Sequence, residues 1–150
     1  MSAQRETSAG LLLCAREFLL ATELVLNRAK GVSLPAYFLF GRSVELSLKA
    51  YLLACGMPMK ELKSREFGHN LSALLREANT RGLPDYVPLE SIETGVIELL
   101  SYDYMEKRLE YRVTGGTYYL PLIDVTEHVA RKLVSGLEAF CTDTKGVQNP

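Results

Sequence analysis

Apolar side chains recur with helical spacing along most of the chain, and they are densest in the stretch Pro35–Gly56. At 100° per residue, apolar or small side chains occupy almost every side of a helix formed by this stretch. Ser33 can cap the start of this helix, Pro35 suits its first turn, and Gly56 marks its end. We therefore predict a central helix against which the other elements pack.

Four further segments repeat apolar residues at intervals of three and four, which predicts amphipathic helices. The link between the first of them and the central helix is short, so these two helices should be antiparallel neighbours. Met59–Lys63 is compatible with one additional helical turn. The four predicted helices are Ser8–Ala29, Leu71–Arg81, Pro88–Arg108 and Leu122–Cys141.

The pattern predicts an all-α fold, an up-and-down bundle of four to five helices in a single domain. Its core should span about residues 8–141, with a flexible tail at 142–150. The segment Tyr102–Leu120 holds five of the eight tyrosines and the pair Gly115-Gly116. This segment can form a short hairpin or an ordered loop over one end of the bundle. Gly95, inside a predicted helix, suggests a close contact with another helix.

The composition narrows the functional classes. The 150 residues are 47% hydrophobic and carry a net charge of −1, which suits one globular domain and not a protein that coats nucleic acid. The three cysteines, Cys14, Cys55 and Cys141, are odd in number and lie in apolar helices, so we expect buried free thiols in a reducing cytoplasm.

The chain has only two histidines and no Cys-x-x-Cys motif, so it offers few ligands for a zinc site. We expect neither a metal nor a cofactor. No apolar run reaches the ~18 residues of a membrane span, and the short apolar run Leu11–Ala15 is too brief for a secretory signal. We therefore expect a cytoplasmic protein without a membrane partner.

The central helix carries one charged stripe, formed by Arg42, Glu45 and Lys49. Their i,i+3 and i,i+4 spacing allows both cations to meet the carboxylate. Apolar residues flank the stripe on both sides, so its charges should be partly desolvated and in need of partners. Two interpretations stay open: an internal salt bridge that fixes the register of the helix, or the floor of an anion or nucleotide pocket.

Three other residues are candidates for the same site. His69 precedes a predicted helix start and could act as an acid or base, or it could cap the turn or bond to Glu45. Arg112 could bind phosphate or form a salt bridge to a nearby glutamate. Tyr111 could join such a pocket, although grouped tyrosines also plug bundle ends and dimer seams.

Three segments together resemble the HEPN family of helical-bundle domains: RSVELSLKAYLLACG, FGHNLSALLREA and EYRVTGG. The resemblance covers about residues 8–141. It implies a bundle of four or five helices, frequently dimeric, of the kind found in bacterial and archaeal defence and toxin systems. If the family layout holds, Arg42, Glu45, Lys49, His69, Tyr111 and Arg112 converge at one end of the bundle as a ligand-binding site.

Many members of that family resemble metal-independent ribonucleases, with an Arg followed by His after four to six residues. From Arg112 those positions hold Thr117, Tyr118 and Tyr119, and Arg65 stands one residue too close to His69. Because the signature is absent, we assign no catalytic residue and favour a protein that is not an enzyme.

We therefore expect a non-catalytic HEPN-like binding or interaction module, most simply a homodimer. It could bind a nucleotide or RNA, or pair with a nucleotidyltransferase-type partner in a toxin–antitoxin or defence setting. One alternative is an endoribonuclease with a degenerate site, in which His69 or Tyr118 works with Arg112. The other is a purely structural helical dimer.

Overall fold

The computed structural model describes residues 5–112 and 114–147, and in these ranges the chain forms helices and no strand. The predicted all-α class is confirmed. One of the six α-helices is a single turn of four residues, and a short 3₁₀ helix is also present. The elements are α1 (Ser8–Arg28), α2 (Leu34–Ala54), α3 (Met59–Leu62), α4 (Leu71–Thr80), η1 (Leu83–Asp85), α5 (Ser91–Met105) and α6 (Ile123–Val147).

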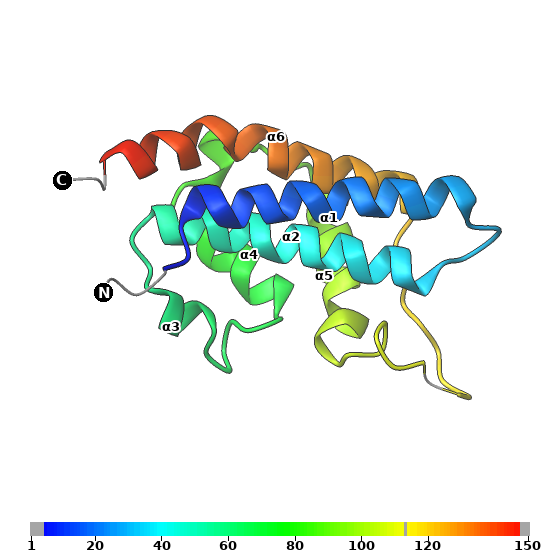
Figure 1. Cartoon of the computed structure of the whole chain (residues 1–150). Coiled ribbons are helices and arrows are strands. Elements are labelled where there is room, and N and C mark those ends of the chain that lie inside the picture. Colours follow the sequence, from blue (N-terminus) through cyan, green and yellow to red (C-terminus); the bar gives the residue numbers. More distant parts are fainter. Residues whose placement is uncertain (1–4, 113, 148–150) are drawn as a thin grey trace.

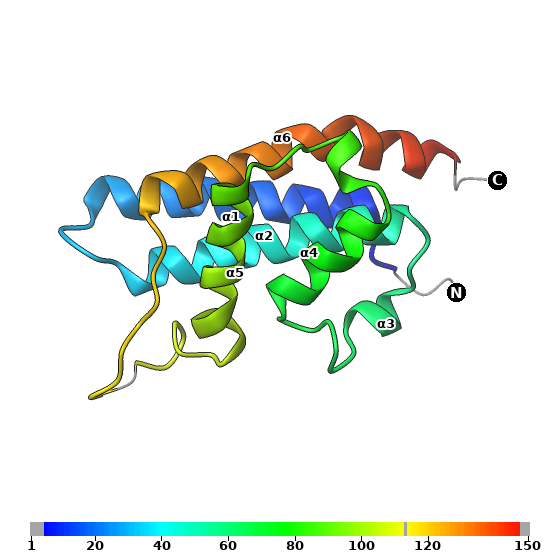
Figure 2. The ribbon, with the colours of Figure 1, turned by 180° about the vertical axis from the view of Figure 1, so that it is seen from behind.

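The three long helices α1, α2 and α6 lie side by side, and α1 runs opposite to the other two (Figure 1). The Ser8 hydroxyl donates to the Cys141 carbonyl at 3.2 Å, which ties the start of α1 to the later part of α6. Helices α4 and α5 cover the other side of α2 (Figure 2). Because α5 runs crosswise over α2 (Figure 2), the up-and-down description fits only the three long helices.

Helix α2 is the central element, as its apolar pattern predicts. The Ser33 hydroxyl caps it by accepting from the Ala36 amide at 3.2 Å, and Gly56 ends it with a φ of 104°. Helices α1, α4, α5 and α6 all contact α2, so its buried residues lie on every side. The small side chain of Ser43 lets α1 approach closely, and its hydroxyl donates to the Ala15 carbonyl at 2.8 Å.

The segment between α5 and α6 is a loop and not a hairpin within residues 106–112 and 114–122. Helix α6 continues past Cys141, its predicted end, to Val147. The flexibility of residues 142–150 stays a prediction, and residues 148–150 lie outside the described residues.

Two local predictions are wrong. A Cβ built on Gly95 would meet no atom within 4 Å, so no helix packs closely there. The three cysteines are free, but only Cys141 is buried, while Cys14 is exposed on α1. None of the described helices combines the length and the apolar character that crossing a bilayer needs.

Candidate functional site

The carboxylate of Glu45, midway along α2, is buried at the centre of a polar cluster and is only 2% exposed. Lys49 and Arg42 donate to Oε2 at 2.8 and 3.3 Å, as their spacing on the helix predicts. His69 Nδ1 lies 2.9 Å from Oε1, and the Tyr104 hydroxyl donates to the same oxygen at 2.5 Å. We call these five residues the Glu45 cluster.

The protonation states in the Glu45 cluster follow from its neighbours. Burial by itself raises the pKa of Glu45, but the charge of Lys49 and the hydrogen bonds from Lys49, Tyr104 and His69 outweigh it and lower the pKa. Burial, followed by the charge of Glu45, raises the pKa of Tyr104, so this phenol stays a neutral donor. Since an ionised carboxylate only accepts, Nδ1 of His69 carries the proton of their hydrogen bond.

Local structure fixes the two members that come from outside α2. His69 lies two residues before α4, whose start is held by the Asn70 side chain accepting from the Ala73 amide at 3.1 Å. The Tyr104 ring packs against α2 at Gly41, where an added Cβ would lie 2.3 Å from the ring. The ring also meets the His69 ring edge-on, with 6.0 Å between centroids. The start of α4 therefore positions His69, and packing against Gly41 positions Tyr104, for their hydrogen bonds to Glu45.

Tyr104 is the member of the Glu45 cluster that sequence reasoning missed. It follows the buried residues Ile97 and Leu100 by seven and four positions, so helical spacing already places it on the inner face of α5. Grouping it with the other tyrosines of the loop segment concealed this signal. Tyr104 is almost completely buried, whereas Tyr102 and Tyr119 are exposed.

The structure does not bring Tyr111 and Arg112 to the Glu45 cluster. Both side chains are exposed in the loop between α5 and α6, and no hydrogen bond or ion pair joins either to Glu45 in the described part of the chain. The predicted convergence of six residues at one bundle end is therefore wrong for these two. The remaining four meet midway along α2, because three of them lie on that helix and the segment before α4 brings His69 to Glu45.

Arg108, near the start of this loop, contacts both α5 and a later part of the loop. Its Nη2 donates to the Thr117 carbonyl at 2.5 Å, and its Nε lies 2.8 Å from the buried Oδ1 of Asp103. The latter two atoms are within ion-pair distance but are not aligned as a hydrogen bond. The second carboxylate oxygen of Asp103 accepts from the Tyr119 amide at 2.6 Å. These contacts attach the loop to the end of α5.

A second buried carboxylate, Glu93, joins the starts of α5 and α6, and the sequence analysis did not single it out. It accepts from Lys132 Nζ at 2.9 Å and from the Glu90 amide at 2.7 Å, and His128 Nε2 lies 3.2 Å away. Desolvation raises the pKa of Glu93, but the Glu90 amide, Lys132 and His128 together lower it. The i,i+4 spacing of His128 and Lys132 was the available signal.

The lowered pKa of Glu93 gives stability a defined dependence on pH. Its contribution is complete above the ordinary glutamate value of ~4.3 and is lost as the pH falls through the lower folded-state pKa. We expect the difference in unfolding free energy between wild type and Glu93→Gln to shrink between about pH 5 and pH 3. Urea unfolding across this range checks it, and a constant difference would contradict it.

The two histidines have similar contacts in the structure. Each binds a buried carboxylate, and no hydrogen bond joins either to a serine or cysteine among the residues described. The same residues contain no group of three or more His, Cys, Asp or Glu side chains placed to hold a metal ion.

No family model, no curated protein and no solved structure matches the chain.

Proposed function

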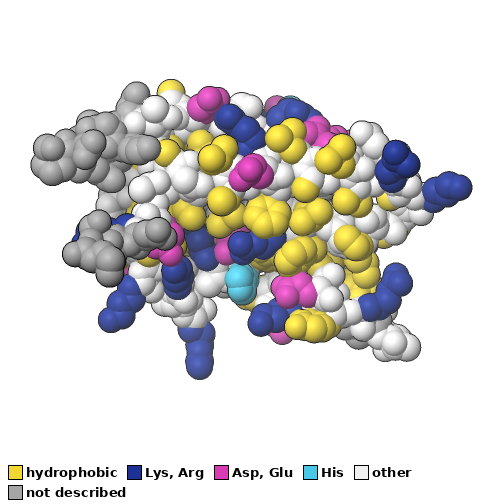
Figure 3. All heavy atoms as spheres, viewed as in Figure 1, with side chains coloured by type: hydrophobic (Ala, Val, Ile, Leu, Met, Phe, Trp, Pro, Cys, Tyr) yellow, Lys and Arg dark blue, Asp and Glu magenta, His cyan; other side chains and the backbone are white. Residues whose placement is uncertain are grey.

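We propose that this chain is a non-catalytic, HEPN-like interaction module that works as a homodimer. The observation that carries the proposal is a stripe of exposed leucines on α1: Leu13, Leu20 and Leu24 are 56%, 55% and 70% exposed. Their spacing of seven and four residues puts them on one side of the helix. Apolar side chains gather over α1 on this face of the molecule (Figure 3). A surface stripe of this kind is typical of a protein interface.

The resemblance to the HEPN family supports the same role. Its three matching segments fall on α2, around the start of α4 and in the loop before α6. The ribonuclease signature of that family is absent from the sequence. Arg42, Lys49 and His69 all contact Glu45, which favours an interaction role over nucleotide or RNA binding. The resemblance also makes a nucleotidyltransferase-type chain of a toxin–antitoxin pair a suitable partner for the dimer.

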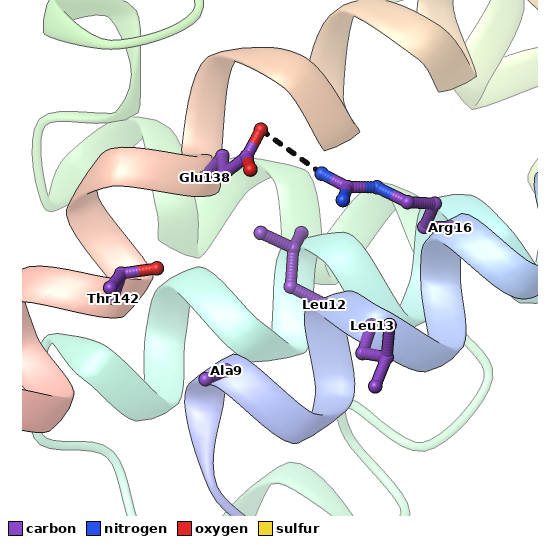
Figure 4. A pocket seen from close by; sticks show the side chains of 6 residues that line it. All are labelled: Ala9, Leu12, Leu13, Arg16, Glu138 and Thr142. Atoms are coloured by element: carbon purple, nitrogen blue, oxygen red, sulfur yellow. Dashed lines mark ion pairs between the residues drawn. The ribbon is translucent and has the colours of Figure 1, made fainter.

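The charges beside the α1 stripe favour a second copy of this chain as its occupant. Arg16 pairs with Glu138 of α6 at 3.1 Å (Figure 4), and Glu23 pairs with Arg131. The flanks therefore hold little unbalanced charge that would repel an identical surface. Two exposed charges on the stripe side, Glu17 and Arg28, have no ion pair within the described residues. Antiparallel packing about a two-fold axis near Glu23 would place Glu17 beside Arg28 of the second copy.

Charge exchange on α1 tests this homodimer. We expect Glu17→Arg and Arg28→Glu each to raise the dimer dissociation constant by roughly three- to tenfold, because each puts like charges together. The double variant should return it to near the wild-type value. Sedimentation equilibrium measures all three constants. The matched control is Glu98→Arg, an exposed change on α5 that should leave the dimer unaffected.

A wild-type protein that stays monomeric at about 100 μM would contradict the dimer, since specific homodimers normally form well below that concentration. A double variant that dimerises no better than the single variants would contradict the antiparallel geometry and leave another surface of α1 to explain association.

A further inference from the structure

Helix α5 and the start of α6 lie on the face of the molecule opposite α1 (Figure 2). Between them is a second apolar surface, a groove. The groove has a volume of about 260 Å³ and is lined almost entirely by apolar side chains. Ile92, Leu99 and Leu122 on its walls are 59%, 39% and 71% exposed. We call this surface the α5–α6 groove. The described chain places nothing over it.

The spacing along α5 gives the groove the dimensions of a helix-binding site. Ile92, Gly95, Leu99 and Tyr102 share one side of α5 and span about 15 Å at 1.5 Å per residue. A partner helix with apolar residues at i, i+4 and i+7 covers about 10 Å of this length, the distance from Ile92 to Leu99 at the same rise. Gly95 has no side chain to fill the middle of this surface, and an added Cβ there would meet nothing. The absent side chain therefore leaves room for an apolar anchor of the partner.

The aromatic end of the surface extends it toward the loop. The Tyr102 and Tyr119 rings pack edge to face, with centroids 4.8 Å apart, and both side chains are about half exposed. The Tyr119 amide is held by the buried carboxylate of Asp103 at 2.6 Å, so this end of the surface is fixed in place. Exposed, immobilised tyrosines are favoured in protein interfaces because they lose little conformational entropy on binding.

The rim of the groove is acidic. Residues 90–106 contain five carboxylates and no lysine or arginine. Two of them are neutralised within the chain, Glu93 by Lys132 and Asp103 by Arg108. Of the described residues beside the groove, Glu90 and the exposed Asp124 of α6 form no ion pair.

Glu90 and Asp124 lie at one end of the α5–α6 groove, where a second hollow of about 330 Å³ adjoins it and shares Ile92 and Val125. Glu90, Glu93 and Asp124 line this hollow together with His128 and Lys132, which both contact Glu93. An identical acidic rim would repel a second copy of this chain, whereas a cationic segment would be attracted. This contrasts with α1, whose flanking charges are paired.

We propose that the α5–α6 groove binds an amphipathic helix of a partner protein, with apolar side chains in the groove and lysine or arginine side chains against the acidic rim. The proposal rests on the role of the chain as an interaction module but uses a surface separate from the α1 stripe. A dimer formed through α1 would therefore present two such grooves. The partner is defined by its chemistry: a leucine-rich helical seam with basic flanks.

Three synthetic peptides of roughly 18 residues, about five helical turns, test the proposal. The basic peptide has leucines at i, i+4 and i+7 with lysine flanks, the acidic peptide has glutamate flanks, and the third has serines in place of the leucines. Fluorescence anisotropy with the full chain measures binding. We expect the basic peptide to bind at least about tenfold more tightly than either of the others, with an affinity that falls as salt rises.

Protein variants locate the binding site. Leu99→Ser, on the wall of the groove, should weaken the basic peptide by about tenfold, because an apolar anchor loses its contact. Glu90→Gln together with Asp124→Asn, at the acidic end of the groove, should weaken it about threefold or more and flatten its salt dependence. The matched control, Leu24→Ser on the α1 stripe, should leave the binding unchanged. All four positions are exposed, so circular dichroism should show native helix content in each variant.

Each other outcome overturns the proposal. Equal binding of basic and acidic peptides would show that the rim plays no part. Binding that survives Leu99→Ser would place the peptide elsewhere, and no binding at all would remove the site. If Leu99→Ser converts a dimer into a monomer, a second copy occupies the groove. Failure of the α1 dimer alone, with peptide binding intact, leaves this inference standing, so the two proposals can fail separately.

Discussion

Replacing Glu45 by glutamine is expected to lower the free energy of unfolding by roughly 3–5 kcal/mol. Glu45 accepts hydrogen bonds from four side chains, and one of them, Lys49, is only 7% exposed. Without the carboxylate, the Lys49 ammonium is left buried with no counter-charge. For a domain of 150 residues the loss corresponds to a fall in the melting temperature of roughly 10 °C. Urea and thermal unfolding measure both quantities.

Lys49→Met is the matched control for this substitution. It removes one donor but leaves the Glu45 carboxylate with Arg42, His69 and Tyr104, so it should cost less than Glu45→Gln. The double variant should be more stable than Glu45→Gln alone, because the orphaned ammonium is gone. If the two losses simply add, Glu45 and Lys49 are not coupled, and the Glu45 cluster is not a desolvated ion pair.

The part of the fold that the sequence predicts is the part set by short-range spacing. Apolar periodicity gives the five longer helices, and the cap at Ser33 forms as its residue type indicates. The contacts of Arg42 and Lys49 with Glu45 follow from i,i+3 and i,i+4 geometry on a single helix. Such contacts need no knowledge of how the helices are arranged.

The sequence did not predict which residues of different helices contact each other. The bond from Tyr104 to Glu45 joins residues 59 positions apart and exists because α5 crosses α2 at that level. The bridge from Glu93 to Lys132 likewise depends on how α5 meets α6. The loop after α5 carries Tyr111 and Arg112 away from Glu45, although both precede α6 as the family resemblance led us to expect. Periodicity specifies which face of a helix is buried but not the residue that it meets.

Glycines illustrate the same limit. A glycine inside a helix suggests a close approach, and Gly95 was the candidate in the sequence. The close approaches lie instead at Gly41, against the Tyr104 ring, and at Gly136, where an added Cβ would lie 2.7 Å from the Val87 side chain. At Gly95 the missing side chain opens the α5–α6 groove. One residue type thus serves packing at two positions and leaves an open surface at the third.

Gly41→Ala should therefore destabilise the protein by about 2 kcal/mol or more, although alanine favours a helix by about 1 kcal/mol over glycine. The added Cβ would lie 2.3 Å from the Tyr104 ring. The ring cannot retreat without stretching the 2.5 Å bond from its hydroxyl to Glu45, so the substitution strains the packing and the Glu45 cluster together. Unfolding in urea gives the free energy.

Gly95→Ala is the matched control, because the same substitution in an open helical position should stabilise the protein by about 0.5–1 kcal/mol. The sign of the effect thus separates a steric clash from helix propensity. In a Tyr104→Leu background the ring is absent, and Gly41→Ala should then cost little. If Gly41→Ala stabilised the wild type as much as Gly95→Ala, the Tyr104 ring could not lie against Gly41. The buried bond between Tyr104 and Glu45, which depends on that position, would then fail with it.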